Sequence, residues 1–342
     1  MEIKLIQDSD IDSWEKYILD HPGGTFYHAL GWKRVIEKSF GHHTYYLMAK
    51  EHGKVCGILP IVHIKSLLFG SIMCSMPFLN FGGVCADNDE VERALLGEAE
   101  RILKDKKGDY LELRHMKKSS MDYPAKTHKV SMTLELESDP EILWSKFATK
   151  HRTTIRRAAK NDLELRVGKQ DLLKDFFPLL CKGWKALGTP LYNFYFFKNI
   201  MEELEDHIEI FLILHQSRPI AGAMNGIFRD TVEGMWLASL NEYARLQGGY
   251  FLYWEMIRRY CELGYRHFHL GRSTADGSAE FFKKKWNAVP KPLFWEYIMN
   301  RDGKLPELNV QNSKYQLAIN VWKKLPLPVT KTLGPIFARS IP

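Results

Sequence analysis

A run of basic side chains near the middle of the chain is the first feature with the means to do chemistry. Residues 150–160 read KHRTTIRRAAK and contain no acidic residue. At helical spacing, positions four apart share one face, and guanidinium groups hold phosphate oxygens through paired hydrogen bonds. The run therefore predicts a binding face for a diphosphate or an RNA backbone, with a solvated helix surface as the alternative. Its expected substrate-binding residues are Lys150, Arg152, Arg156 and Lys160.

A polar strand end is the second candidate. An apolar strand closes with Gly-Arg-Ser-Thr at residues 271–274, and a loop of small residues leads into a short lysine-rich helix. Ligand sites of α/β proteins collect at strand ends, where helix N-termini supply N–H donors. A structural turn beside a solvated lysine patch is the alternative. We predict a site here with Arg272 and Lys283 as catalytic residues and Ser273 and Thr274 as substrate contacts.

A pair of glycines precedes a predicted helix and forms a weaker third candidate. Arg245, Gly248 and Gly249 approach the Arg/Gln-x-x-Gly-x-Gly/Ala loop of acyl-CoA-dependent N-acetyltransferases, but Tyr250 stands where that loop needs its last small residue. A plain turn would look the same. We expect Arg245 and the two glycines to contact the donor if this loop is functional.

Motifs for other chemistries are missing from the sequence. It has no His-Glu-x-x-His, no Cys-x-x-Cys, no Gly-x-Ser-x-Gly and no Walker loop. Metal-dependent and nucleotide hydrolysis are therefore disfavoured, and no metal or tightly bound cofactor is expected. The five cysteines are odd in number and widely spaced, which is typical of reduced core thiols.

Length and charge favour a two-domain protein with anionic partners. The 342 residues suffice for two ordinary domains, and the net charge of +7 suits phosphate-bearing substrates without implying duplex DNA binding. No stretch reaches the roughly 20 apolar residues that a membrane span needs. We expect a cytoplasmic protein, and the lysines among apolar residues of the tail raise the further hypothesis of peripheral contact with the inner face of the membrane.

A sequence pattern that recurs after 165 residues supports an internal duplication. Tyr27 and Tyr192 each precede an aromatic helix-like segment, and Gly57 and Gly222 each lie in a second strand; both pairs are 165 residues apart. Each half reads as helix, hairpin, further strand, glycine turn, helix and strand. Predicted helices span 31–39, 90–104, 141–160, 195–204 and 251–263. The expected domains are 1–138 and 139–308, with the tail 309–342 returning to complete the first.

Motifs spread over most of the chain resemble one family. They are Phe26-Tyr27-His28 with Gly31-Trp32, Gly41-His42, Leu59-Pro60, Asn80-Phe81-Gly82-Gly83, Tyr110-Leu111-Glu112-Leu113-Arg114, Gly188-Thr189-Pro190, Gly271-Arg272-Ser273-Thr274, Phe282-Lys283-x-x-Trp286 and, in the tail, Trp322-Lys323-Lys324-Leu325-Pro326 with Leu333-Gly334-Pro335. Together they resemble the FemAB-like proteins of the GNAT superfamily, and more closely those that accompany PEP-CTERM/exosortase and exopolysaccharide systems.

The resemblance implies an α/β protein with two tandem GNAT-like acyltransferase domains, in which mixed sheets are flanked by helices. It also implies transfer of an acyl or aminoacyl group from acyl-CoA or aminoacyl-tRNA to an amine of a cell-envelope or surface-polysaccharide precursor. Lys283 matches the family's Phe-Lys-x-x-Phe/Trp lysine, which is proposed to stabilise charge. Tyr27, Trp32 and Tyr192 are further expected substrate contacts.

One position departs from the family. Members that build peptidoglycan bridges commonly carry a lysine four residues after the first-domain Trp, and that position is Ile36 here. A peptidoglycan precursor is therefore a less secure acceptor. The alternative function is a non-catalytic protein that keeps the double fold to bind a nucleotide-sugar or RNA.

Overall fold

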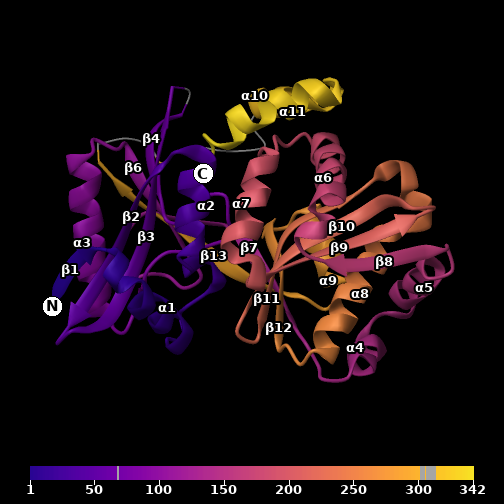
Figure 1. Ribbon diagram of the computed structural model, residues 1–342, viewed down its shortest axis with the longest axis horizontal. Helices are drawn as coiled ribbons and strands as arrows, with labels where there is room; N and C mark the ends of the chain where they lie inside the picture. The colour runs from indigo at the N-terminus through magenta and orange to yellow at the C-terminus, as the bar shows by residue number, and fades with distance from the viewer. Residues whose placement is uncertain (68, 301–304, 306–312) are drawn as a thin grey trace. The chain divides into compact units, whose positions relative to one another are not determined.

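The computed structural model describes residues 1–67, 69–300, 305 and 313–342, and the chain divides into two compact units (Figure 1). The first unit comprises Met1–Val130, Lys291–Glu307 and Arg339–Pro342. The second comprises Ser131–Pro290 and Leu308–Ala338. Each unit is a mixed sheet with packed helices.

The first unit holds a sheet in the order β1-β2-β3-β4-β6-β13, with β5 paired to β3. β4 and β6 are parallel, and the other neighbours in this order are antiparallel. The strands are β1 (Glu2–Leu5), β2 (His43–Glu51), β3 (Lys54–Ser66), β4 (Gly70–Cys74), β5 (Cys85–Ala86), β6 (Tyr110–His115), the start of β7 (Ala125–Glu135) and the end of β13 (Val289–Met299). The helices are α1 (Ile11–Asp20), α2 (Gly31–Phe40) and α3 (Asp89–Asp105), with 3-10 turns η1 (Asp8–Asp10) and η2 (Phe26–His28).

Helix α3 shows how the sequence builds this unit. The Asn88 side chain accepts hydrogen bonds from the backbone N–H groups of Glu90 and Val91, which caps the helix. The apolar face of α3 is buried in the core with β2, β3 and β6. A Cβ on Gly57 of β3 would lie 2.6 Å from Val91 Cγ1, so glycine lets the helix approach the sheet closely.

The second unit holds a sheet in the order β12-β11-β10-β9-β8. Its strands are β8 (Leu163–Gly168), β9 (Ile208–His215), β10 (Arg218–Phe228), β11 (Thr231–Ser239) and β12 (His267–Thr274). Its helices are α4 (Pro140–Lys146), α5 (Thr149–Ala158), α6 (Leu173–Leu187), α7 (Phe194–Leu204), α8 (Gly248–Glu262), α9 (Ser278–Lys284), α10 (Ser313–Lys324) and α11 (Leu327–Ala338). The 3-10 turns are η3 (Gln170–Leu172), η4 (Glu205–His207) and η5 (Asn241–Leu246).

Helices α6 and α8 cover opposite faces of the second sheet. On β9, the Phe211 ring packs on Tyr260 of α8, with 5.6 Å between ring centroids. The next residue, Leu212, lies with Leu179 of α6 around the position that a Cβ on Gly222 would occupy. Successive side chains of a strand point to opposite faces, so the apolar run of β9 is buried on both.

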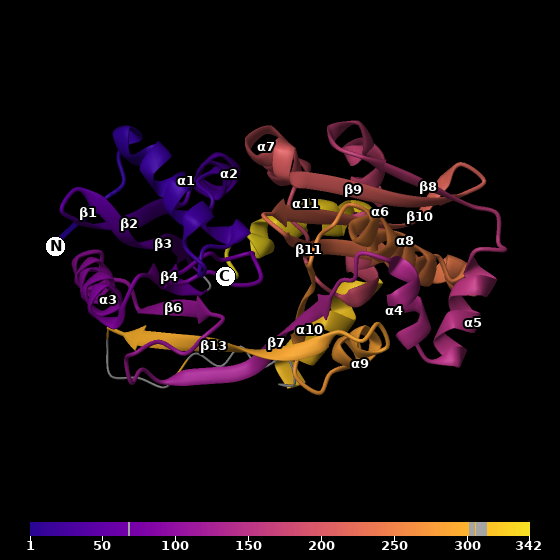
Figure 2. The ribbon, with the colours of Figure 1, turned by 90° about the horizontal axis from the view of Figure 1, so that it is seen from below.

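The predicted duplication appears as a repeated topology. The order β2-β3-β4-β6, paired antiparallel, antiparallel and parallel, recurs in β9-β10-β11-β12, and Figure 2 shows β9 and β10 side by side. A helix precedes each four-strand set, α2 in one unit and α7 in the other, and a helix precedes each last strand. The predicted helices 31–39, 90–104, 195–204 and 251–263 are confirmed within a few residues.

The single helix predicted over 141–160 is wrong, because it is broken in two. α4 ends at Lys146 and α5 begins at Thr149, with extended backbone at Phe147 (ψ 142°) and Ala148 (ψ 142°) between them. The Phe147 ring is 2% exposed and meets the Trp286 ring edge-on at 5.6 Å. Burying this aromatic ring requires the chain to turn, which a continuous helix would prevent.

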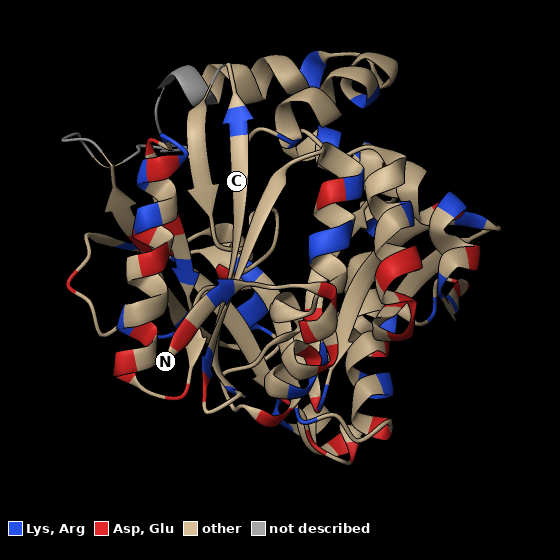
Figure 3. Cartoon of the chain, turned by 60° about the vertical axis from the view of Figure 1, so that its left-hand side comes forward, with Lys and Arg blue, Asp and Glu red and all other residues tan. Residues whose placement is uncertain are grey.

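The tail packs differently from the expectation that it completes the first domain. Residues 308–338 belong to the second unit, and only 339–342 join the first. A Cβ on Gly188, the left-handed end of α6, would lie 2.5 Å from Ile319 Cγ2 of α10. The tail helices, at the top of Figure 3, display basic but no acidic side chains. Among the described helices, none is long and apolar enough to cross a bilayer.

Replacement of Gly334 should release the tail from the segment that follows α6. A Cβ there would lie 2.8 Å from the Leu191 carbonyl oxygen, and backbone cannot move aside as a flexible side chain can. We expect Gly334→Val to speed proteolysis of the tail by about tenfold or more. Lowering the free energy of tail opening by roughly 1.4 kcal/mol raises the population of the open form tenfold. Gly97→Val is the control, since nothing lies within 4 Å of the place that its Cβ would take. Equal cleavage of both variants and the wild type would contradict this packing.

Candidate active site

The parallel strands β11 and β12 part at the predicted strand end. Their paired register ends at Glu233 and His269, although both strands continue. Two glycines stand at this point: a Cβ on Gly271 would lie 2.7 Å from the Gly234 carbonyl oxygen, and the φ of Gly271 is +79°. Glycine is needed here for both conformation and space. The paired register with β11 does not extend to the last residues of β12.

Lys283 on α9 binds this end of β12. Its Nζ donates to the Gly271 carbonyl at 2.9 Å, the Arg272 carbonyl at 3.2 Å and the Ser273 Oγ at 3.0 Å. An ammonium group has three donors, so the three oxygens satisfy it. The side chain is 8% exposed, whereas Thr274 next along the strand is exposed. The predicted association of Lys283 with the Arg-Ser-Thr strand end is thus present in the structure.

The surroundings of Lys283 destabilise its charged form. Burial lowers the pKa of this ammonium to about 7, and the nearby Arg272 charge contributes in the same direction. Glu280 on the same helix is buried but pairs with Lys284, so it leaves Lys283 without a carboxylate partner among the described residues. A lysine that titrates near neutrality can exchange a proton or carry charge in a reaction.

The glycine turn before α8 has a packing role as well as a predicted binding role. Gln247 precedes the helix in a left-handed conformation (φ 56°), and α8 begins with Gly248 and Gly249. A Cβ on Gly248 would lie 3.0 Å from Ile220 Cδ1, so that glycine also admits close packing on β10. Arg245 on η5 is exposed.

The basic run forms a shorter face than predicted. α5 ends before Lys160, which is exposed, as are Lys150 and Arg156. The Arg156 guanidinium lies 5.3 Å from the centre of the Trp144 ring. Arg152 is half-buried, and its Nε has no hydrogen-bond partner among the residues that the structure describes. Arg152 therefore has a buried donor without a partner in the described parts of the chain.

An aromatic cluster next to α5 was not predicted as part of the site. His151 meets Trp286 edge-on with 4.3 Å between centroids, and burial, with the Lys285 charge, lowers the pKa of the His151 imidazole to about 4. His151 Nε2, Trp286 Nε1 and the Gln247 side-chain oxygen are buried and lack partners within the described parts of the chain. Buried polar atoms are normally satisfied by protein or water. Sequence reasoning missed His151 because it lies inside the basic run, whose charged residues were interpreted together as a binding face.

A carboxylate and an imidazole meet where the ladder ends, and sequence reasoning missed this pair too. The Glu233 Oε1 and His269 Nδ1 atoms are 2.7 Å apart, and Glu233 is 2% exposed. The sequence does place an acidic residue, Glu233, within an apolar strand. Acidic residues are rarely buried without a partner, so this position could have indicated the pair. Within the described ranges, no group of three or more His, Cys, Asp and Glu side chains is arranged to hold a metal ion.

Two expected substrate contacts of the first unit are core residues instead. Tyr27 and Trp32 are each 0% exposed. The Tyr27 hydroxyl accepts from Asn80 Nδ2 at 2.7 Å, and the Trp32 indole donates to the Phe26 carbonyl at 3.0 Å. Their aromatic pattern reflects packing, because their polar atoms are already satisfied inside the unit.

Tyr192 lies in a different part of the second unit from Lys283. It lines a pocket with residues of α6, α10 and α11, and its ring packs on Phe196 at 4.6 Å. The structure therefore gathers Lys283, Arg272 and Ser273, whereas Tyr192 belongs to the tail pocket.

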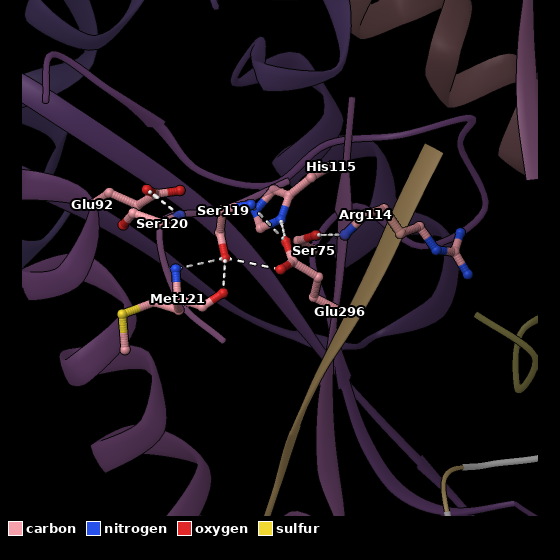
Figure 4. Close-up of polar contacts among 8 residues, drawn as sticks. All are labelled: Ser75, Glu92, Arg114, His115, Ser119, Ser120, Met121 and Glu296. Carbon is pink, nitrogen blue, oxygen red and sulfur yellow. Dashed lines mark hydrogen bonds and ion pairs between the residues drawn. The ribbon is translucent and has the colours of Figure 1, made fainter. Parts of the chain in front are cut away.

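The corresponding strand opening in the first unit is occupied by its own chain. The paired register of β4 and β6 ends at Cys74 and Glu112. Beyond it, the Arg114 backbone N–H donates to Ser75 Oγ at 2.8 Å (Figure 4). The Arg114 carbonyl accepts from Gly82 N–H at 2.9 Å. The segment from 75 to 82 thus bridges the end of β6, so the opening of the second unit is the better candidate for a donor site.

A buried carboxylate organises the polar cluster in Figure 4. Glu296 on β13 is 0% exposed, and its oxygens lie 2.6 Å from His115 Nδ1 and 2.9 Å from Ser119 Oγ. The Ser119 backbone N–H also donates to it at 3.0 Å. Although burial raises the pKa of Glu296, these hydrogen bonds lower it more, and the net pKa lies below its usual value. The cluster fixes the segment after β6 onto β13.

Comparison with known proteins agrees with this choice of unit. Residues 145–284 match the family described as "Acetyltransferase (GNAT) domain". The matched stretch lies within the second unit. The match spans α5, α8, β11, β12 and Lys283. A search of curated proteins found no significant match.

Solved structures share the fold of this chain over most of its length. A crystal structure of FemX has a TM-score of 0.66 at 16% identity, covering 86% of this chain and 97% of that one. The C-terminal domain (DUF2156) of a putative lysylphosphatidylglycerol synthetase from Agrobacterium fabrum has a TM-score of 0.58 at 12% identity, covering 92% and 96%. A tandem GNAT protein from the clavulanic acid pathway has a TM-score of 0.51 at 9% identity, covering 89% and 100%. The predicted tandem GNAT fold is confirmed.

Lys283 should give the protein a distinctive pH dependence of stability. Its pKa of about 7 in the folded chain lies below the 10.5 of an ordinary lysine, so the unfolded chain binds more protons between these values and stability rises with pH there. Between pH 7.5 and 9.5 the gain from this one group is about 2 kcal/mol. We expect urea unfolding to show this gain for the wild type relative to Lys283→Met. Parallel pH curves for the two proteins would contradict it.

Glu296→Gln should destabilise the first unit by about 1 to 3 kcal/mol at pH 7, because it removes a buried charge from three hydrogen bonds. The stability that the carboxylate contributes is present above about pH 4.3 and is lost as pH falls through its lowered folded pKa. Urea titrations at pH 7 and pH 3 should therefore show the difference shrinking. Glu92→Gln, whose hydrogen bond to Ser120 is exposed, should cost less than about 0.5 kcal/mol.

Proposed function

We propose that the GNAT chain is an acyl or aminoacyl transferase that forms an amide on an amine of a cell-envelope or surface-polysaccharide precursor. The observation that carries the proposal is the environment of Lys283. This lysine is buried, has a pKa near 7 and donates to the end of β12 within the residues that match the GNAT domain. Its ammonium donates to three strand oxygens, and no carboxylate pairs with it among the described residues.

The reaction needs a positive group near the carbonyl oxygen and polar groups that hold the substrate, and this site can supply both. An amine that attacks an acyl ester or thioester carbonyl gains positive charge, and the carbonyl oxygen gains negative charge. Lys283 in its ammonium form would stabilise that oxygen after exchanging one of its strand oxygens for the substrate. Arg272 would add positive potential, and Ser273 and Thr274 would contact the substrate at the strand end. As the amide C–N bond forms, the C–O bond of an ester donor or the C–S bond of a thioester donor breaks, and the departing alcohol or thiol takes up the proton that the amine loses.

The donor is proposed as acyl-CoA or aminoacyl-tRNA. A GNAT domain favours acyl-CoA, and Arg245 with the N–H groups of Gly248 and Gly249 would take its phosphates at the start of α8. The basic residues Lys150, Arg152, Arg156 and Lys160 would serve either donor, since both carry phosphates. FemX and the lysylphosphatidylglycerol synthetase domain share the fold, and the synthetase's name favours aminoacyl transfer.

The acceptor is proposed to be an envelope precursor other than the peptidoglycan bridge substrate. Ile36 is 1% exposed in α2, so this position offers neither a charge nor access to a diphosphate. The PEP-CTERM-associated FemAB-like subtype and a cytoplasmic location remain part of the proposal. The second candidate is a nucleotide-sugar- or RNA-binding protein. The observation that favours it is the set of exposed cations on α5.

Turnover separates the two functions. Labelled acetyl-CoA and labelled aminoacyl-tRNA are each incubated with the protein and a set of amine acceptors, and amide products are identified by mass spectrometry. A product in either arm supports transfer. Saturable binding of both donors without any product under all conditions would favour the binding protein.

Lys283→Met should lower transfer by about a hundredfold, because removal of one preorganised oxyanion donor costs on the order of 3 kcal/mol. Lys285→Met is the matched control: this lysine is exposed on the same helix turn and should change transfer less than about threefold. Steady-state rates at physiological salt measure both. Equal losses would mean that the lysines act only as a diffuse basic patch.

Arg152→Ala should weaken binding of the phosphate-bearing donor by about 1 to 3 kcal/mol, since its buried Nε lacks a partner among the described residues. Arg157→Ala removes an exposed charge from the same helix and should have a smaller effect. Titration calorimetry with each donor gives the affinities. An unchanged affinity for Arg152→Ala would assign α5 to the solvated surface.

A further inference from the structure

The pocket beneath the tail helices is chemically unlike the GNAT site and is not used by the proposed reaction. It lies within the second unit, between α6, the segment 189–192, α10 and α11. Close backbone packing fixes its walls: a Cβ on Gly188 would clash with Ile319, and a Cβ on Gly334 would clash with Leu191. The pocket is thus a built feature of the fold.

The pocket is lined by two cations and no acid. Lys185 donates from Nζ to the Lys323 carbonyl at 3.1 Å, and the Lys331 ammonium lies 5.9 Å from the centre of the Phe177 ring. Neither lysine has an acidic partner among the residues that the structure describes. Thr189 adds a hydroxyl to the lining. Two cations around a hydroxyl are suited to a phosphate group.

A buried donor points to the same ligand chemistry. Trp322 lines the pocket and is 9% exposed, and its indole N–H finds no acceptor among the described residues. A buried N–H without an acceptor costs free energy unless a ligand or water supplies one. An anionic oxygen in the pocket would offer this donor an acceptor and carry a charge opposite to that of the two lysines.

The outer faces of the same helices are apolar. Leu317 and Val321 of α10, four residues apart, are 66% and 51% exposed, and Val329 and Ile336 of α11, seven apart, are 38% and 58% exposed. The sequence from 309 to 342 contains five basic residues and no acid. Exposed apolar side chains beside unopposed lysines are the pattern of helices that lie in an anionic membrane surface.

We propose that α6, α10 and α11 form a docking site for an anionic phospholipid, with the phosphate in the Lys185–Lys331–Trp322 pocket and the apolar side chains of α10 and α11 in the acyl-chain boundary. Free phosphate esters share the headgroup chemistry, but they would leave the apolar faces in water. The lipid surface is therefore the occupant that accounts for both the pocket and the faces. The proposal does not depend on transfer activity.

Sedimentation with vesicles tests the proposal on the full chain. We expect binding to phosphatidylcholine vesicles that contain phosphatidylglycerol, weak binding to phosphatidylcholine alone, and loss of binding at high salt. The double variant Lys185→Gln/Lys331→Gln should reduce partitioning by about tenfold or more, since each lysine near an anionic surface contributes about fivefold. Lys174→Gln, an exposed position at the start of α6, is the control and should stay within about twofold.

Two further variants distinguish the pocket from the faces. Trp322→Phe keeps an aromatic ring but removes the N–H, and it should weaken binding to phosphatidylglycerol vesicles while leaving the melting temperature nearly unchanged. Leu317→Ser/Val321→Ser alters only exposed side chains and should weaken binding to the same vesicles without unfolding the chain.

Several outcomes would overturn the proposal. They are equal binding to neutral and anionic vesicles, equal losses for the double lysine variant and Lys174→Gln, and no effect of the apolar-face variant. Calorimetric binding of glycerol 3-phosphate as tight as binding to vesicles would assign the pocket to a soluble phosphate ester. Binding of polyuridine RNA that survives Leu317→Ser/Val321→Ser and exceeds binding to vesicles would assign the tail to RNA.

Discussion

The hydrogen bonds from Lys283 to the end of β12 are the interaction on which the GNAT site depends. Where the register with β11 stops, the carbonyls of Gly271 and Arg272 accept hydrogen bonds from the Lys283 ammonium group. The same contacts take the lysine out of water and lower the pKa of its ammonium. One interaction thus holds the strand apart from its neighbour and prepares a titratable group beside the opening.

The two units differ in what lies beside the end of their parallel strand pair. In each, two parallel strands at the end of a four-strand set part after a few paired residues. The first unit fills the gap with its own segment, through Ser75 and Gly82, and ties the neighbouring segment to β13 by the buried Glu296. The second unit places a lysine there. A duplicated fold can therefore keep one opening for chemistry while the other becomes structure.

Aromatic packing links the basic helix to the site in the second unit. Phe147, His151 and Trp286 contact one another, which joins α5 to the end of α9, and Tyr253 of α8 stacks on Trp286 at 5.3 Å. This cluster explains why the basic helix is interrupted. It also means that α5 and the segment after the helix that carries Lys283 share an aromatic contact.

The sequence by itself determined the repeated α/β pattern, most of the helices around it and the association of the Gly-Arg-Ser-Thr strand end with Lys283. Those features depend on local periodicity and on motifs that are contiguous in the chain. Tertiary structure alone decided that Tyr27 and Trp32 are core residues, that Phe147 breaks the basic helix, and that the tail packs on α6. Each of these depends on which distant residue fills a given space: Asn80 meets Tyr27, Trp286 meets Phe147, and Ile319 meets Gly188. Residue type and spacing record that a side chain must be buried, but the partner that buries it is chosen by packing.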